Sequence, residues 1–556
     1  MVNLVTSVSK YLMLIIMILY TCLNFYVLRK NDLKWQNRVC RKQIYLVFLL
    51  QFLGYLIIYL RTEEVEMLIF YALQVVFFLT YYLVFKTLYP KCSQVLLSNM
   101  LLLFSIGLMV NTRLKVERAE KQFIIGVVGC VITLFIPTII RHLKSLSKLA
   151  WLYAIVGIGL LGFVWIFGNT TYGAQLTLSL GPISLQPSEF VKITFVFFVA
   201  SMFTKSRSLG WAIVTTIVAA IHVLILVAST DLGSGLVYFM AYLFMLLVVT
   251  HRVWLFALGL GAGSGAAVLA YQVFDHVKVR VQMWIDPFVD YENKGYQLAQ
   301  SLLAISSGGW FGLGFYQGLP TSIPLAQNDY IFAAICEELG MIFAICLVLI
   351  YLGFFLQLFW VSTWMNELFY KVIGFGFAAM LAVQTFLHIG GVTKMIPATG
   401  ITLPLVSYGG SSVLSTMIII GIIQGLHLMR QKEAEDNERK AVRADAGTKH
   451  RENPEQKHRS GKSEHSKNTG GKDAGAKHST VRTTGVRHTE TKSAKRTEAE
   501  RTTKSAAAKS TAKSTAKSTA KSTTKSTTKS GSAGGSKVRS GSTGTKSTQK
   551  NKRKTD

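Results

Sequence analysis

The stretch FIIGVVGCVITLFIPTII, residues 123–140, is predominantly apolar and carries no charged side chain. A helix needs about 20 such residues to cross a hydrocarbon core of about 30 Å. Runs of this kind recur between residues 10 and 428, and each predicts a membrane-spanning helix. The candidate spans are 10–28, 44–60, 67–89, 95–111, 123–140, 149–167, 188–204, 211–228, 232–250, 253–273, 329–358, 371–392 and 404–428. The predicted fold class is therefore an all-α polytopic membrane protein with about 13 transmembrane helices.

The rest of the chain, residues 431–556, has a different composition. It holds 32 Lys and Arg residues against 13 Asp and Glu residues, and so contributes most of the net charge of +30. Residues 506–530 read AAAKSTAKSTAKSTAKSTTKSTTKS, an imperfect repeat of Lys, Ser, Thr and Ala. Such a composition cannot bury enough apolar surface to offset chain entropy, so we expect a disordered basic tail. The tail is either a solvated polycation or a non-specific ligand of anionic lipid or nucleic acid.

The placement of Lys and Arg predicts the orientation, because cytoplasmic loops carry an excess of them. The basic loops 29–43, 141–148 and 205–207 fall on one side together with the tail. We therefore expect a bacterial plasma-membrane protein with the N-terminus outside and the tail in the cytoplasm. The loop 112–122 disagrees, since Arg113, Lys115, Arg118 and Lys121 fall on the predicted outer side, but the other loops outweigh it.

Ionisable residues in or beside the spans gather near the predicted outer side. Such residues are costly at membrane depth and are usually functional. The long segment 274–328 lies on the same side and contains aromatic and Gly-rich stretches, so we expect it to be ordered and functional. The residues concerned are Glu189, Lys192, Asp231, Asp329, Glu337, Glu338, His388 and Lys394.

Each of these residues also has a purely structural interpretation. Glu189 and Lys192 are spaced as an i,i+3 helix pair. Asp231 and Asp329 each precede an apolar run, as helix N-caps do. Glu337 and Glu338 suit ion pairs within the bundle, and His388 suits a hydrogen bond between helices.

Two Gly-rich stretches, Ser306–Gly309 and Ser407–Ser412, do not match a P-loop, which needs GxxxxGK[ST] after a strand. They favour either close helix approach or backbone contact with a diphosphate. The six cysteines form no CxxC or Cys/His pattern, so the sequence leaves the metal-binding residues unknown.

Read in order, a series of short motifs resembles the SEDS family of membrane proteins, the FtsW/RodA/SpoVE group. The motifs are Gln186–Lys192 (QPSEFVK), Asp231–Ser234 (DLGS), Arg280 with Trp284–Pro287 (WIDP), Gly295–Gln297, Gln300–Ser301, Ser307–Gly309, Gly312–Gly314, Asn328–Ala333 (NDYIFA), Glu337–Gly340 (EELG) and Leu403–Ser411 (LPLVSYGGS). The family core has ten spans. The resemblance therefore implies a core over 95–430, an added N-terminal membrane region over 1–94 with about three spans, and an added tail over 431–556.

The resemblance implies a peptidoglycan glycosyltransferase that polymerises lipid II at the outer membrane face during division or cell-shape maintenance. It releases undecaprenyl diphosphate and is paired with a class B penicillin-binding transpeptidase. The essential family Asp corresponds to Asp329 and the important Glu of QPSE to Glu189. Further candidates for substrate binding or support are Lys192, Arg280, Trp284, Asp286, Glu338, Lys394, Ser407, Gly409 and Gly410.

The chemistry predicts a role for these side chains. A carboxylate within reach of the attacking sugar hydroxyl can accept its proton, which we assign to Asp329. The lipid diphosphate that leaves needs positive charge, from Arg280, Lys192 or Lys394, alone or with a divalent cation such as Mg²⁺ or Mn²⁺.

The sequence departs from the family pattern at four places. Tyr172–Leu178 lacks the basic pair and Trp of the usual NGARRWI stretch, Thr230 replaces a Gln, Leu325 replaces an acidic residue, and His388 replaces an Asn. Two other functions remain open at this stage: a flippase or transporter of lipid-linked precursors, and a non-catalytic scaffold for cell-wall or division proteins. The clustering of charges at one face, without an internal repeat, disfavours the first, and the retained Asp329 and Glu189 disfavour the second.

Overall fold

The computed structural model describes residues 2–29, 32–142, 145–171, 174–180, 183–206 and 208–452. The predicted tail beyond residue 452, together with Lys144, Tyr172, Gly173 and Arg207, lies outside the described residues. The long helices are α1 (Val2–Tyr26), α2 (Leu33–Thr62), α3 (Val65–Leu88), α4 (Gln94–Leu114), α5 (Val116–His142), α6 (Ala150–Phe167), α7 (Pro187–Lys205), α8 (Leu209–Ala228), α9 (Leu232–Thr250), α10 (Val253–Val273), α14 (Met341–Thr363), α15 (Leu368–Val392) and α16 (Gly410–Glu452). Shorter elements are α11 (Asp275–Ile285), α12 (Tyr296–Gly308), α13 (Ile331–Leu339), β1 (Asn169–Thr171), β2 (Ala174–Leu180) and β3 (Ile183–Leu185).

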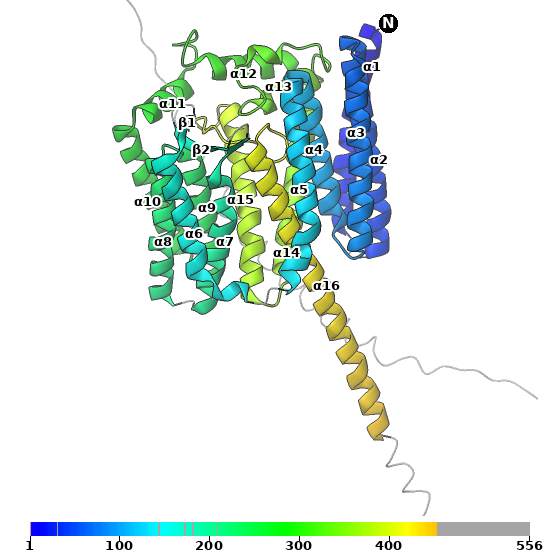
Figure 1. Cartoon of the computed structure of the whole chain (residues 1–556), viewed down its shortest axis with the longest axis vertical. Coiled ribbons are helices and arrows are strands. Elements are labelled where there is room, and N and C mark those ends of the chain that lie inside the picture. The colour runs from blue at the N-terminus through cyan, green and yellow to red at the C-terminus, as the bar shows by residue number, and fades with distance from the viewer. Residues whose placement is uncertain are drawn as a thin grey trace, which may run out of the picture. The chain divides into compact units, whose positions relative to one another are not determined.

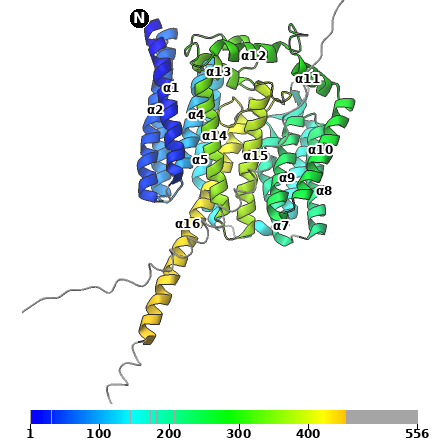
Figure 2. The ribbon, with the colours of Figure 1, turned by 180° about the vertical axis from the view of Figure 1, so that it is seen from behind.

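The described residues contain 13 helices that are long and apolar enough to cross a membrane. The prediction of an all-α polytopic membrane protein is therefore confirmed. Figure 1 shows α11, α12 and α13 at the same end of the bundle as the N-terminus, whereas α16 projects from the other end. Figure 2 shows the same arrangement from behind, with α1 and α2 at one flank and α8 and α10 at the other.

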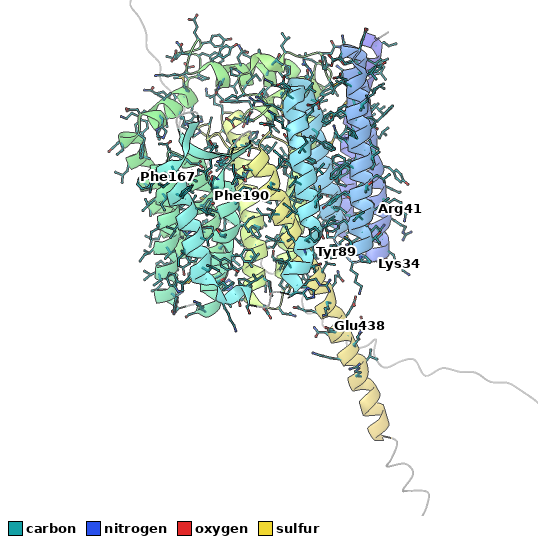
Figure 3. The ribbon with its side chains drawn as sticks, in the orientation of Figure 1. Lys34, Arg41, Tyr89, Phe167, Phe190 and Glu438 are labelled. Atoms are coloured by element: carbon teal, nitrogen blue, oxygen red, sulfur yellow. The ribbon has the colours of Figure 1, made fainter. Side chains whose placement is uncertain are left out.

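Basic residues mark the end of the bundle from which α16 leaves. Figure 3 labels Lys34 of α2 near this end, close to the level of Tyr89, and Arg41 further along the same helix. Figure 3 also labels Glu438 on the projecting part of α16. Lys34 of α2 and the C-terminal helix thus lie at the same end of the bundle.

Helix α4 lies at the centre of the bundle, and its residues Gln94–Thr112 are all buried. Several of its polar side chains are paired there, because an unpaired polar group in hydrocarbon costs several kcal/mol. Asn99 accepts a hydrogen bond from the Tyr20 hydroxyl at 2.9 Å. Asn111 donates to the carbonyl oxygen of Val406 at 3.1 Å. These bonds tie α4 to α1 and to the loop before α16.

The predicted span 329–358 is wrong as one helix, since the chain breaks at Gly340 into α13 and α14. Gly340 has φ 88°, and a Cβ there would lie 2.4 Å from the amide nitrogen of Gly312. The amide nitrogen of Met341 donates to the carbonyl oxygen of Gly309 at 3.0 Å. Pairing with residues 309–314 therefore replaces the helical hydrogen bonds at this point. As a consequence, Glu338 lies in a short helix outside the long spans, and Asp329 lies just before that helix.

Two further differences concern the ends of elements. Residues 169–185 include a small antiparallel sheet, β1-β2-β3, that was not predicted. The alternation of polar and apolar residues over Gln175–Leu180 is the signal for it. In addition, α16 continues to Glu452, past the predicted start of the tail at residue 431. Residues 431–443 are rich in Glu, Lys, Arg and Ala, which are strong helix formers.

Candidate active site

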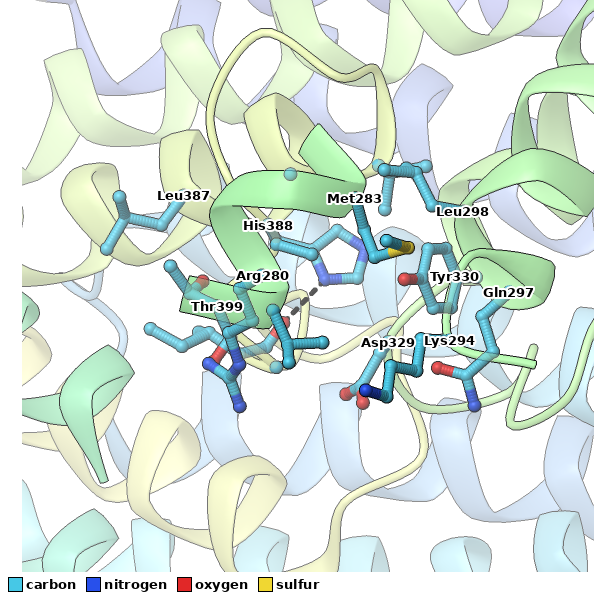
Figure 4. A pocket seen from close by; sticks show the side chains of 16 residues that line it. Arg280, Met283, Lys294, Gln297, Leu298, Asp329, Tyr330, Leu387, His388 and Thr399 are labelled. Carbon is cyan, nitrogen blue, oxygen red and sulfur yellow. Dashed lines mark hydrogen bonds between the residues drawn. The ribbon is translucent and has the colours of Figure 1, made fainter. Parts of the chain in front are cut away.

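A cavity of about 170 Å³ opens where α11, α12 and α15 meet the segments before α13 and α16. Figure 4 shows Arg280, Lys294, Asp329 and His388 among the side chains that line it. Its other walls come from Val279, Met283, Gln297, Leu298, Tyr330, Leu387, Gly391, Val392, Ala398, Thr399, Gly400 and Ile401. One carboxylate and two cationic side chains thus share a mostly apolar pocket at the end of the bundle.

Asp329 supplies the carboxylate of this pocket. Among the described residues, no hydrogen-bond donor or ion-pair partner lies within bonding distance of its carboxylate oxygens. Burial raises the pKa of Asp329 from 3.8 to about 6, and the positive charge of Arg280 opposes part of that rise. A carboxylate with a pKa near the working pH and no internal partner is suited to accept a proton.

The backbone before Asp329 is held by the segment that precedes α16. The Ser407 hydroxyl donates to the carbonyl oxygen of Asn328 at 2.6 Å. The Asn328 side chain donates to the carbonyl oxygen of Tyr408 at 3.1 Å, and Tyr408 donates its amide proton to the Gln327 carbonyl at 2.7 Å. Arg118 donates to the Asn328 side-chain oxygen at 3.1 Å. Ser407 therefore positions Asp329 and does not line the pocket.

Helix α11 carries Arg280 and is docked on the segment after α15. The Arg280 guanidinium donates to the carbonyl oxygen of Thr399 at 3.3 Å, and the Trp284 indole donates to that of Lys394 at 3.1 Å. The Lys394 ammonium is not among the described groups that line the pocket. The structure thus brings Arg280 to Asp329, while Trp284 and Lys394 connect α11 to its support.

Glu189 and Lys192 lie apart from the pocket, in a buried network between helices. The Lys192 ammonium is 2.7 Å from a Glu189 carboxylate oxygen and 2.9 Å from the Gln384 side-chain oxygen. Ser415 donates to the same Glu189 oxygen at 3.0 Å. Gln384 in turn donates to the carbonyl oxygen of Thr402 at 3.0 Å. The network links α7, α15 and α16 and reaches the pocket through the segment 399–402.

The other candidates are placed as follows. Asp286 is exposed and accepts a hydrogen bond from the Phe288 amide at 2.9 Å. Glu338 forms a buried ion pair with Arg113, with 3.0 Å between Nε and Oε1. A Cβ at Gly410 would lie 2.5 Å from Ile125 Cδ1, and one at Gly409 would lie 3.3 Å from Thr402 Cγ2, so both glycines serve close packing.

Two residues of this region were missed from the sequence. Lys294 lines the pocket and directly precedes the Gly295–Gln297 motif, so its position was a usable signal. Arg113 was noted only as an exception to the charge rule for loops. Its side chain pairs with Glu338 and donates to the Gly318 carbonyl oxygen, 3.1 Å away, so this cation has partners within the fold.

The described side chains offer few ligands for the divalent cation considered in the sequence analysis. In the described part of the chain, no three His, Cys, Asp or Glu side chains gather closely enough to hold a metal ion. Asp329 is the single carboxylate among the described residues that line the pocket. This donor set does not fit a metal ion held by the described side chains of the protein.

The fold and the pocket together define a polytopic membrane protein with a carboxylate–guanidinium site at one end of its helix bundle. Residues 86–432 match the family model of FtsW, RodA and SpoVE, described as cell cycle proteins. Since this match spans more than half of the chain, the protein belongs to the FtsW/RodA/SpoVE family, the SEDS family.

Individual relatives agree with this assignment. The peptidoglycan glycosyltransferase RodA of Mycobacterium tuberculosis H37Rv is 30% identical over 363 residues, which cover 60% of this chain and 77% of that protein. The peptidoglycan glycosyltransferase MrdB of Escherichia coli K12 is 31% identical over 323 residues, covering 57% and 86%. A chain from a solved peptidoglycan synthase complex superposes with a TM-score of 0.52 at 23% identity, covering 60% of this chain and 97% of that one, which shows a shared fold.

Proposed function

We propose that this protein is a peptidoglycan glycosyltransferase that polymerises lipid II, with Asp329 as the catalytic base. The observation that carries the proposal is the partnerless Asp329 carboxylate beside Arg280, in a pocket of the described residues at the end of the membrane bundle. A substrate with a membrane-embedded lipid and a solvent-exposed sugar suits a pocket at this level. The names of the related RodA and MrdB proteins support the same reaction.

The reaction is a single displacement at the anomeric carbon of a sugar linked to a lipid diphosphate. A sugar 4-hydroxyl attacks that carbon while Asp329 takes the hydroxyl proton. The bond from the carbon to the diphosphate oxygen breaks, and the electron pair leaves with undecaprenyl diphosphate. One displacement inverts the anomeric centre. Arg280 and Lys294 line the pocket and stabilise the negative charge of the leaving group.

The orientation and the partner follow from the same proposal. The pocket, the N-terminus and segment 274–328 face the cell exterior, and α16 leads into the cytoplasm. A class B penicillin-binding transpeptidase crosslinks the product, a pairing supported by the solved complex, whose description joins polymerisation with crosslinking. Labelling of single cysteines introduced at exposed Val289 and Lys432 by a membrane-impermeant reagent tests the orientation. The first should react in intact cells and the second only after lysis.

The central experiment is polymerisation of labelled lipid II by the purified full-length protein, with and without its co-purified transpeptidase. We expect long glycan strands on a gel, and inversion at the anomeric carbon. A folded protein that yields no strands under either condition would overturn the proposed function. Transport of lipid II across vesicle bilayers by the same sample would then support the flippase alternative.

The pH dependence of kcat gives a separate prediction for Arg280. The Asp329 carboxyl acts as a base only when ionised, so kcat should fall about tenfold per pH unit below its pKa of about 6. Arg280→Met removes a positive charge that stabilises the ionised form, so the pKa of Asp329 rises and the acidic limb moves to higher pH. Measurement of kcat from pH 5 to 8 checks this shift. Lys278→Met, a change on the same helix, should leave the acidic limb of the kcat–pH profile at its wild-type position. If the acidic limb also stays in place in Arg280→Met, the proposed electrostatic pairing of Arg280 with Asp329 is contradicted.

A further inference from the structure

Helix α1 of the added N-terminal region contacts segment 309–314, which is hydrogen-bonded to the C-terminal end of α13. The Lys10 ammonium donates to the carbonyl oxygen of Gly312 at 3.2 Å, across 302 residues of sequence. The rings of Tyr11 and Phe311 have centroids 6.0 Å apart. Helix α1 lies outside the matched range 86–432, so Lys10 and Tyr11 belong to a part of the chain that the family model does not cover, whereas Phe311 and Gly312 lie inside it.

Helix α1 is anchored near its C-terminal end by buried hydrogen bonds to α4. The Asn99 side chain of α4 donates to the Asn24 side-chain oxygen at 3.0 Å and accepts from Tyr20. Gly353 of α14 leaves room for Asn24, since a Cβ there would lie 2.2 Å from the Asn24 amide nitrogen. Because buried polar bonds inside a membrane bundle are costly to leave unmade, α1 holds a defined height and rotation.

The segment 309–314 is in turn paired with the end of α13. The amide nitrogens of Leu313 and Gly314 donate to the carbonyl oxygens of Glu337 and Glu338, each at 2.9 Å. The approach is too close for side chains, because a Cβ at Gly312 would lie 2.4 Å from the Glu338 carbonyl oxygen. A displacement of Gly312 must therefore displace residues 337–340.

Helix α13 joins this contact to the active site. It has nine residues, from Ile331 to Leu339, and Asp329 lies shortly before it. A short helix transmits a shift of one end to the other because its internal hydrogen bonds keep its length constant. The path from Lys10 runs through the Gly312 carbonyl and the Leu313 and Gly314 amides to Glu337 and Glu338, and then along α13 and the covalent backbone to Asp329.

We propose that α1 of the added N-terminal region positions the active site, with Lys10 and Tyr11 holding segment 309–314 and thereby α13 and Asp329. Lys10 is thus a positioning residue that acts through the Gly312 backbone. This inference rests on the proposed function for its kinetic consequence, but its structural consequence can be measured independently.

The test compares Lys10→Met, Lys10→Arg and wild type as full-length proteins in the same detergent or vesicles. Hydrogen exchange of the Leu313 and Gly314 amides should be about tenfold faster in Lys10→Met and near wild type in Lys10→Arg, which keeps a donor. Polymerisation of labelled lipid II should show kcat about tenfold lower in Lys10→Met, with KM within about twofold, because a misplaced base slows chemistry more than binding. Lys34→Met, which removes an exposed lysine of the same region at the other end, is the matched control and should change neither readout.

The outcomes separate this inference from the proposed function. If wild type makes no glycan, the proposed function fails, and exchange alone decides the role of Lys10. The variant Lys10→Met/Tyr11→Leu removes both contacts. If its exchange at Leu313 and Gly314 equals that of wild type, the positioning role is overturned. Unchanged kcat alongside faster exchange would overturn the link from segment 309–314 to Asp329.

Discussion

Asp329→Asn should lower the rate of glycan polymerisation by about 10²–10⁴-fold, the range that a positioned general base contributes. The amide has nearly the shape of the carboxylate but cannot take the proton of the attacking hydroxyl. Its neighbours lose little, since no described side chain donates a hydrogen bond to the Asp329 carboxylate. We therefore expect a normal level of folded protein and unchanged binding of lipid II. The measurement is single-turnover conversion of labelled lipid II, alongside binding of the same substrate.

A matched control for this variant is Asp275→Asn. Asp275 is an exposed carboxylate at the start of α11 whose partner is Lys278, 2.9 Å away. The control removes the same charge near the same surface without touching the pocket, so polymerisation should stay within about twofold of wild type. Near-normal glycan synthesis by Asp329→Asn would rule out its role as base, and an equal loss in both variants would attribute the effect to surface charge.

The spans could be predicted because hydrocarbon imposes a local rule on each segment. The rule is that a spanning helix needs about 20 consecutive apolar residues. It locates a span but not its ends: the predicted span 123–140 lies inside α5, which runs from Val116 to His142. The apolar run after Gly340 concealed the break, although Glu337 and Glu338 directly before this glycine were a local signal for it. Its cause is the distant segment 309–314, whose backbone occupies the space that a continuous helix would need.

The candidate site was predicted in part for a similar reason. Asp329 and Arg280 lie in recognisable motifs, and the pocket brings them together. The sequence could not separate residues that line the pocket from residues that hold its walls. Ser407, Trp284 and Lys394 act through backbone hydrogen bonds, which depend on the folded course of two loops.

Arg113 carried a signal of its own. A basic residue on the predicted outer side departs from the charge rule for loops, and a charge beside the membrane is usually paired. The structure supplies that partner in Glu338, which the sequence had placed among the ionisable residues of the same side. The pairing itself could not be predicted, because the two residues are 225 positions apart in the chain.

Lys192→Met should be among the most destabilising substitutions in the chain, with a loss of about 3–5 kcal/mol in the free energy of unfolding. The Lys192 and Glu189 side chains are 3% and 7% exposed, so the variant leaves a buried carboxylate without its cation. Ser415 still donates to Glu189, but one neutral hydroxyl does not replace an ammonium. Unfolding of the purified protein in mixed micelles, followed over a denaturant titration, measures the loss. A loss below about 1 kcal/mol would show that the pair contributes little to the fold.

The double variant Glu189→Gln/Lys192→Met separates the structural and chemical roles of this pair. Neither charge remains, so no carboxylate is left buried without a partner, and most of the lost stability should return. The amide oxygen introduced by Glu189→Gln can still accept the Ser415 hydrogen bond. Because neither residue lines the pocket, the double variant should polymerise lipid II within about tenfold of wild type, whereas Lys192→Met alone should lose activity together with folded protein.

A stable double variant whose polymerisation falls about a hundredfold or more would give the pair a direct part in the reaction. The network through Gln384 and Thr402 to the pocket wall would then be the route by which it acts. Near-normal polymerisation by the stable double variant would instead assign the pair to the fold, because its charges would then be dispensable for the chemistry at Asp329.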